Sequence, residues 1–124
     1  MLSQDAIQKL FASIDAMDAK EFASFVSEDG FFVYGAQMNV QGRAQVEQAV
    51  AGFFSTLKSL SHSNLKAWAA EDGTQFVYGD VHYILPNGNE VDIAFLNKFV
   101  FDGDKISHYH VFTDPTPMFA AAQG

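Results

Sequence analysis

The sequence contains no cysteine, only three prolines and only seven lysine and arginine residues. Without cysteine, neither a disulfide framework nor a thiolate metal site is possible. Fifteen Asp and Glu residues give a formal net charge of -8, which repels phosphate backbones. Because nucleic-acid binding normally needs a basic patch, the composition argues against that function.

Long apolar runs and linkers are also missing. No apolar segment approaches the length of a membrane span, and the start of the chain lacks a positive region followed by an apolar run. We therefore expect no membrane contact and a cytoplasmic protein. With 124 residues and 48% hydrophobic residues, the chain suffices for one well-buried core. We expect a single domain spanning residues 1–124.

Aromatic residues are abundant, and the stretch from Val91 to Asp114 organises them. Thirteen Phe, four Tyr and one Trp must line a core, a pocket or an interface. Large apolar side chains recur at every second position, which places them on one face of a strand: Val91, Ile93, Phe95, Phe99 and Phe101. Asn97 interrupts that face. A buried amide is costly without hydrogen bonds, so Asn97 is either a structural tie or the polar end of a small-molecule pocket.

The remaining elements follow from periodicity and turn residues. Apolar spacing predicts three helices: the first has Ser3 as a possible N-cap and apolar positions from Ile7 to Met17, the second runs from 18 to about 30, and the third from 42 to about 58. A short strand over 31–34 and a loop over 35–41, with room for a small edge strand, lie between them. Asp-Gly and Asn-Gly turns join four further strands, at 61–70, 74–85, 90–101 and 105–114. We expect residues 119–124 to form a frayed tail.

Helices followed by an antiparallel meander predict an α+β domain. The helices should cover one face of a curved sheet and leave a conical cavity between the two layers.

Particular segments at these positions carry a resemblance to a known family. They are Ser27-Glu28-Asp29, the run from Gly42 to Gln48 that opens the long helix, Gly103-Asp104-Lys105-Ile106, and Phe112-Thr113-Asp114-Pro115. In order and spacing the chain resembles the SnoaL-like branch of the nuclear transport factor two-like superfamily, which also holds ketosteroid isomerase, scytalone dehydratase and limonene epoxide hydrolase. The resemblance implies a cone-shaped fold, with N-terminal helices packed on a curved, mainly antiparallel mixed sheet. It also implies a deep apolar pocket and usually a homodimer formed by the outer sheet faces.

The functional residues of these relatives carry over poorly. The tyrosine, general-base aspartate and protonated aspartate of the isomerase fall on Leu10, Tyr34 and Asn97. The last-strand acid of polyketide cyclases and of the epoxide hydrolase falls on Val111. The hydrolase's tyrosine and asparagine fall on Phe32 and Tyr34, and Asp80 is the only acid near its remaining residues. Asn97 can donate or accept a hydrogen bond but cannot act as a general acid or base.

Candidate catalytic residues are therefore Asn97, Tyr34, His82 and Asp80. His82 could take a proton with Asp80 or Tyr34 orienting it, but strand alternation favours the outer sheet face for His82, with Asp80 and Ile84. We expect Asp15 on the solvated side of the first helix, although it could serve as a pocket acid. The expected ligand-binding residues are Asn97, Tyr34, Tyr109, Phe95, Phe99, Phe53, Trp68 and Val111.

No metal or cofactor is expected. His108 and His110 have a spacing compatible with two metal ligands, but both face outward if Val111 faces the cavity. Ala94, Leu96, Lys98, Val100 and Phe112 would share that outer face, which is too apolar to leave in water. We expect a homodimer through it.

Two functions fit the sequence. The first is binding of a small apolar ligand with a hydroxyl or carbonyl group, with isomerase, dehydratase or cyclase chemistry through hydrogen-bond polarisation. The second is a non-catalytic dimeric binding or assembly module whose cavity is filled by phenylalanines. A ligand-sized void beside Asn97 would distinguish the first from the second.

Overall fold

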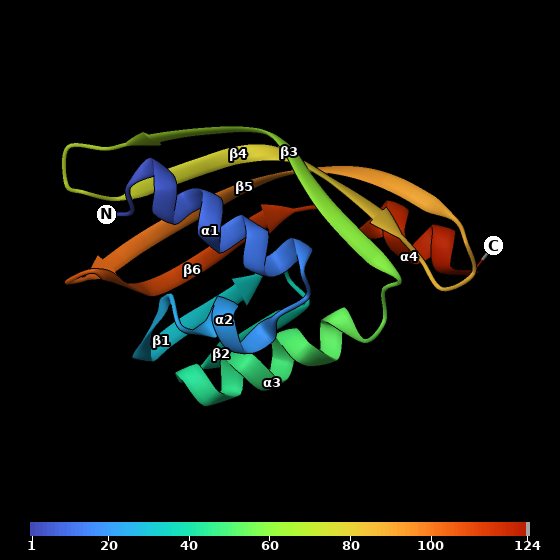
Figure 1. The fold of residues 1–124 in the computed structure, drawn as a ribbon, viewed down its shortest axis with the longest axis horizontal. Helices are drawn as coiled ribbons and strands as arrows, with labels where there is room; N and C mark the ends of the chain where they lie inside the picture. Colours follow the sequence, from blue (N-terminus) through green and yellow to red (C-terminus); the bar gives the residue numbers. More distant parts are fainter. Residues whose placement is uncertain (124) are drawn as a thin grey trace.

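In the computed structural model, residues 1–123 form four helices and one six-stranded sheet (Figure 1). Gly124 lies outside the described residues. The helices are α1 (Gln4–Asp15), α2 (Ala19–Ala23), α3 (Arg43–Phe54) and α4 (Thr116–Gln123). The strands are β1 (Val26–Tyr34), β2 (Met38–Gln41), β3 (Ser59–Ala69), β4 (Gln75–Ile84), β5 (Glu90–Asp102) and β6 (Lys105–Thr113).

The sheet has the strand order β2-β1-β6-β5-β4-β3. Strands β3 to β6 form an antiparallel meander, and β1 joins it by a parallel pairing with β6. Helices α1, α2 and α3 lie together on one face of the curved sheet, and α4 lies apart near the start of β5 (Figure 1). The α+β class and the mixed, mainly antiparallel sheet predicted from the sequence are confirmed.

The core lies between the helix layer and the inner sheet face. Ser3 caps α1 by accepting a hydrogen bond from the Ala6 amide, and Leu10 and Phe11 on this helix are fully or almost fully buried. In β5, Ile93, Phe95, Asn97 and Phe99 are buried while the residues between them are more exposed. The predicted alternation of β5 is therefore observed, and it turns Asn97 inward.

Two predicted boundaries are wrong. The second helix ends at Ala23, not near Gly30, and β1 already begins at Val26. The apolar residues Phe25 and Val26 fit the spacing of a helix as well as that of a strand, so the pattern did not show where the helix ends. The expected frayed tail is helix α4 through Gln123, because local contacts hold it. Asp114 accepts a hydrogen bond from the Thr116 amide, Met118 is buried, and other contacts reach the C-terminal end.

The edge strand β3 contains a bulge between Ser63 and Lys66. Asn64 in this bulge has a positive φ of 58°, and its side-chain amide donates to Asp80 at 2.9 Å. The bulge also brings Leu65 over Gly79, where an added Cβ would come within 2.8 Å of Leu65 Cδ2 and 3.0 Å of the Ser63 carbonyl oxygen. Gly79 therefore permits the bulge of β3 to approach its partner strand β4 closely.

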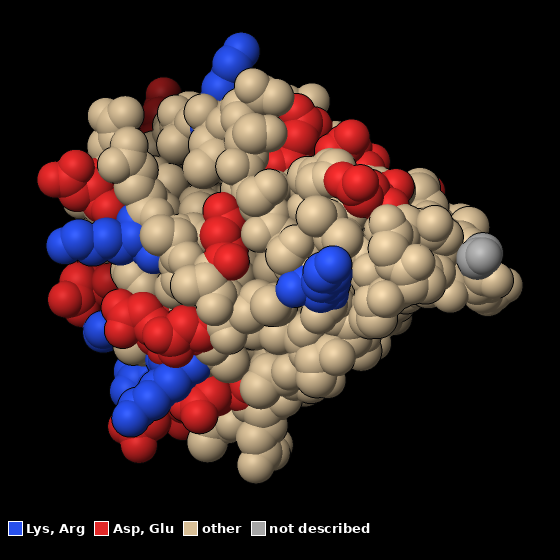
Figure 2. Space-filling model, turned by 45° about the vertical axis from the view of Figure 1, so that its right-hand side comes forward, with Lys and Arg blue, Asp and Glu red and all other residues tan. Residues whose placement is uncertain are grey.

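Helix length and the distribution of charged side chains were predicted from the sequence and can be compared with the structure. Among residues 1–123, no helix is long and apolar enough to cross a membrane. On the face drawn in Figure 2, Lys and Arg side chains are interspersed with Asp and Glu and form no continuous basic patch.

Replacing Gly79 with Ala should destabilise the protein by about 1–3 kcal/mol, because the new methyl group overpacks against Leu65 and the backbone of β3. Gly52→Ala is the matched control: nothing lies within 4 Å of a Cβ at this helical position, so it should stabilise by roughly 0.5–1 kcal/mol. Urea unfolding measures both. Equal effects of the two changes on the free energy of unfolding would contradict this close approach of the β3 bulge to Gly79.

His82 should make stability depend on pH. Its ring nitrogens bond to Asp92 and Glu90, each at 2.7 Å, and these hydrogen bonds raise the pKa of His82. A raised pKa in the folded state stabilises the protein at pH values below the ordinary pKa of about 6.5, and this contribution is lost as pH rises through the folded value. His82→Gln should therefore lower the urea midpoint at pH 6 more than at pH 9. An equal loss at both pH values would contradict this.

Candidate active site

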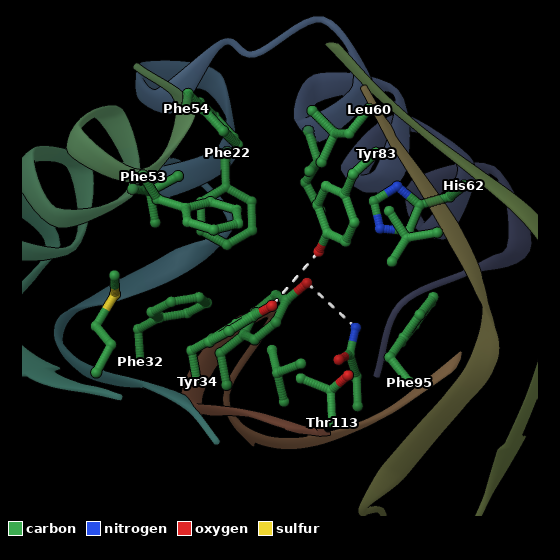
Figure 3. Close-up of a pocket in the computed structure, with 17 residues that line it drawn as sticks. Phe22, Phe32, Tyr34, Phe53, Phe54, Leu60, His62, Tyr83, Phe95 and Thr113 are labelled. Atoms are coloured by element: carbon green, nitrogen blue, oxygen red, sulfur yellow. Dashed lines mark hydrogen bonds between the residues drawn. The ribbon is translucent and has the colours of Figure 1, made fainter. Parts of the chain in front are cut away.

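A cavity of about 70 Å³ lies between the helices and the concave sheet face (Figure 3). Every helix and strand except α4 contributes to its lining, and most lining side chains are aromatic or aliphatic. This volume is about half that of the ~150 Å³ cavity that encloses a benzene ring. The cone is therefore neither completely filled nor as large as the ~300–1,000 Å³ of usual ligand pockets.

Polar groups from four strands meet on one side of the cavity. The hydroxyls of Tyr34 in β1 and Tyr83 in β4 lie 3.4 Å apart and point toward each other (Figure 3). The side-chain amide of Asn97 in β5 donates to the hydroxyl of Tyr109 in β6 at 3.3 Å. Thr113 is no free donor, because its hydroxyl bonds to the Ala94 carbonyl.

The three tyrosines stay protonated at neutral pH. Burial raises the pKa of Tyr34 and of Tyr109. Burial also raises the pKa of Tyr83, and the neighbouring Tyr34 and Tyr109 hydroxyls raise it further. Their O–H groups can therefore donate hydrogen bonds to an oxygen atom of a bound molecule.

On another part of the cavity wall, His62 in β3 pairs with Asp15 at the end of α1. The His62 Nδ1 atom lies 2.5 Å from Asp15 Oδ1. The Asp15 oxygens also accept from the His62 backbone amide, at 3.2 and 3.1 Å. This amide belongs to an edge strand, so it has no strand partner on that side. One carboxylate thus fixes both the backbone and the ring of His62.

Two phenylalanines further restrict the imidazole. The ring centroid of His62 lies 4.9 Å from that of Phe11 and 5.3 Å from that of Phe95, both in edge-to-face arrangements. The His62 side chain is only 8% exposed, whereas that of Asp15 is 31% exposed. The ring is therefore enclosed by aromatic side chains, and the carboxylate keeps contact with water.

This arrangement defines what His62 can do. When Nδ1 donates its hydrogen to Asp15, Nε2 carries a lone pair and can accept a proton. Among the described residues, Nε2 has no hydrogen-bond partner. A buried imidazole oriented by a carboxylate is the arrangement of a general base. Neutral hydroxyl donors complete the site elsewhere on the wall.

The structure brings together six of the residues expected from the sequence: Asn97, Tyr34, Tyr109, Phe95, Phe53 and Val111 all line the cavity. Two expected lining residues lie elsewhere. Phe99 is fully buried in the core, and Trp68 is 51% exposed beside a separate groove near the N-terminus. Phe99 lies in the packed core and Trp68 lies near the end of β3, so neither side chain reaches the cavity.

The candidates His82 and Asp80 do not reach the cavity. Both lie on the outer sheet face, where His82 pairs with Glu90 and Asp92 and Asp80 holds the bulge of β3 through Asn64. His108 and His110 are also on this face, with their rings stacked on Phe31 and Phe112. No group of three potential metal ligands occurs within residues 1–123.

Sequence reasoning missed His62 and Tyr83, and it placed Asp15 on the solvated side. A signal existed for two of them. Leu60 and His62 alternate onto one strand face, as do Val81 and Tyr83, so a histidine and a tyrosine among apolar inward residues could have been noticed. Asp15 gave no such signal, because its partner is 47 residues away.

Solved structures with the same fold span almost the whole chain. A proposed polyketide cyclase from Xanthomonas campestris has a TM-score of 0.82 at 14% identity, covering 94% of this chain and 93% of its own. TerC, crystallised with polyporic acid, has a TM-score of 0.83 at 15% identity and 97% coverage of both chains. A protein of ketosteroid isomerase-like fold from Catenulispora acidiphila, in complex with trimethylamine, has a TM-score of 0.86 at 12% identity, covering 98% and 95%. These identities establish the fold alone.

No curated protein matches the sequence significantly. The model of the SnoaL-like domain, in contrast, matches residues 7–109, which include both members of the Asp15–His62 pair and the tyrosine and asparagine cluster. The cone-shaped fold and this match agree with the resemblance carried by the sequence motifs. The chain belongs to the SnoaL-like domain family.

Proposed function

We propose that this protein is an enzyme that binds a small, largely apolar molecule with a hydroxyl or carbonyl group and transfers a proton to or from it. His62, which lies on the cavity wall and is paired with Asp15 behind it, carries this proposal. His62 acts as general base and acid through Nε2, and Asp15 is a positioning residue. Reactions of this kind include isomerisation, dehydration and cyclisation.

The hydrogen-bond donors support the same chemistry. When a proton leaves a carbon next to a carbonyl group, negative charge develops on the carbonyl oxygen. Neutral O–H groups in an apolar cavity stabilise that charge more than water does, because they are already oriented. Tyr34, Tyr83 and Tyr109 supply such groups from three strands.

The non-catalytic binding or assembly module remains the second candidate. Two observations favour it: the cavity volume of about 70 Å³ is small, and Tyr34, Asn97 and Val111, at the positions of the family's acids, carry no carboxylate. A module of this kind would have no use for a proton-accepting histidine on the wall. The two functions therefore differ in what loss of His62 does.

His62→Gln should slow proton transfer by about 100-fold or more, the usual contribution of a general base. The probe is 2-hydroxycyclohexanone, which has a hydroxyl and a carbonyl on one apolar ring. Nuclear magnetic resonance in D₂O follows exchange of the hydrogen on the carbon between them. His82→Gln is the control: it removes a histidine on the outer face of the neighbouring strand β4 and should keep the wild-type rate.

Asp15→Asn should lower the same rate by at least about tenfold while leaving binding of the probe nearly unchanged. It should also change the tautomer of His62, which ¹⁵N shifts of the ring report, because the amide no longer prefers a donor at Nδ1. Wild-type rates in folded His62→Gln would reject the enzyme and leave the binding module.

We further propose a homodimer through the outer sheet face. Tyr78 and Phe112 are each 45% exposed there, and Leu96 lies between them across β4, β5 and β6. His110 shares this face with Lys98, its cross-strand neighbour. Large apolar side chains gathered on one sheet face are typical of a surface that a partner covers.

Association should weaken at low pH if the partner buries the histidines. Burial and the nearby Lys98 lower the pKa of His110, so a dry interface favours its neutral form, and protonation opposes association. Sedimentation at pH 7.5 and 5.5 measures this. The His108→Gln, His110→Gln variant should lose the pH effect, which separates it from the change in net charge. A monomer at micromolar concentration and pH 7.5 would reject the interface.

A further inference from the structure

One polar atom in the cavity wall has no partner. Asn97 is 2% exposed, and its Nδ2 donates to the Tyr109 hydroxyl, but its Oδ1 has no hydrogen-bond partner among the described residues. It is the only buried side-chain nitrogen or oxygen within residues 1–123 in this condition. Buried acceptors are almost always paired, because an unpaired one has lost its hydrogen bonds to water. Asn97 Oδ1 therefore requires a donor from outside the chain, which is either a water molecule or a group of a ligand that displaces it.

Unused donors lie in the same cluster. The Tyr109 oxygen accepts from Asn97, and within residues 1–123 its own O–H has no acceptor. Tyr34 and Tyr83 hold two hydroxyl hydrogens but share one hydrogen bond, so one O–H remains free. The wall thus offers one acceptor and two donors. A molecule that pairs with all of them must both donate and accept.

Few uncharged groups meet this condition at a single atom. A carbonyl or ether oxygen accepts only, and it would leave Asn97 Oδ1 unpaired. An ammonium group would bring a charge into an apolar cavity, where no carboxylate lines the wall. A hydroxyl group donates one hydrogen and accepts through its lone pairs. It therefore matches the wall.

The cavity also limits what carries the hydroxyl. Its volume of about 70 Å³ is roughly half that of the ~150 Å³ cavity that encloses a benzene ring, so it takes the hydroxyl group and the adjoining edge of a ring and leaves the rest of the ring outside. The walls that would contact the ring are mostly aromatic, with Phe22, Phe32 and Phe53 on one side and Phe95 on another (Figure 3). A flat apolar ring buries well among such side chains.

We propose that the inner cavity is a hydroxyl-reading subsite, in which one ring hydroxyl of the ligand donates to Asn97 Oδ1 and accepts from Tyr109. The ligand class is a phenol or a cyclic enol, with the rest of any larger molecule outside this subsite. This inference deepens the proposed function, because it rests on the same cavity. It assigns selectivity to Asn97 and Tyr109 and leaves proton transfer to His62.

Binding of phenol, anisole and toluene to the wild-type protein tests the subsite. The three rings have similar size, but phenol donates and accepts, anisole only accepts, and toluene does neither. Chemical-shift titration should give phenol an affinity at least about tenfold higher than either of the others, since a site built for a hydroxyl rejects analogues that lack it. Equal binding of the three, tightest binding of anisole or toluene, or no binding at all would overturn the inference.

Asn97→Leu should abolish the preference for phenol and should not weaken toluene. Asn39→Leu is the matched control, because Asn39 is exposed on β2 and should keep the preference. If Asn97→Leu does not fold, Tyr109→Phe should also reduce the preference, and the wild-type comparison stands without either variant. A folded Asn97→Leu that still prefers phenol would contradict the assignment.

The exchange assay with 2-hydroxycyclohexanone separates this inference from the proposed function. Loss of exchange in His62→Gln together with equal binding of the three rings would reject the hydroxyl-reading subsite and keep the general base. Preference for phenol together with wild-type exchange in His62→Gln would keep the subsite and reject the enzyme.

Discussion

The contact of Asp15 with His62 joins the helix layer to the free edge of the sheet. An edge strand leaves backbone amides without partners, and here one of them donates to a carboxylate at the end of α1. The same carboxylate binds the imidazole at 2.5 Å. Because both the backbone and the ring of His62 are fixed by one group, the ring cannot turn without breaking the helix–strand contact. The position of the proton-accepting nitrogen therefore depends on the packing of α1.

The bulge in β3 and the glycine beneath it serve the same end. Because Gly79 has no side chain, Leu65 can pack directly against β4. The hydrogen bond from Asn64 to Asp80 keeps the bulge in place. These contacts lie next to His62 along the strand. Asp80, a candidate for catalysis on the sequence, thus has a structural role at the outer face, where it stabilises the strand that carries the base.

Strand alternation made much of this fold predictable. Alternate apolar positions indicated the faces of β5, and the turn residues indicated the meander, so the sequence placed Asn97 on the apolar face of its strand. The local pattern did not predict the boundary between α2 and β1, because Phe25 and Val26 fit the apolar spacing of both elements. It also failed where a distant contact decides: helix α4 depends on Asn87 and Asn89, which come from the β4–β5 turn.

The site was less predictable, because its ionisable pair is made by packing. The positions that carry acids in the resembled enzymes hold Tyr34, Asn97 and Val111, which indicated that the carboxylate chemistry of those enzymes does not transfer to this chain. The structure instead supplies a histidine from the edge strand and an aspartate from the first helix. Neither residue type is unusual, and 47 positions separate them. Only the curvature that brings β3 against α1 makes them one unit.

The distribution of polar groups follows from the cost of charge in an apolar cavity. A carboxylate on the inner wall would need several hydrogen bonds or a counter-ion to remain ionised there. This chain keeps its carboxylate at the rim, 31% exposed, and places an imidazole on the cavity wall instead. The tyrosines and Asn97 are neutral. The interior therefore carries donors and acceptors without a carboxylate on its wall, which suits a ligand that is itself uncharged and mostly apolar.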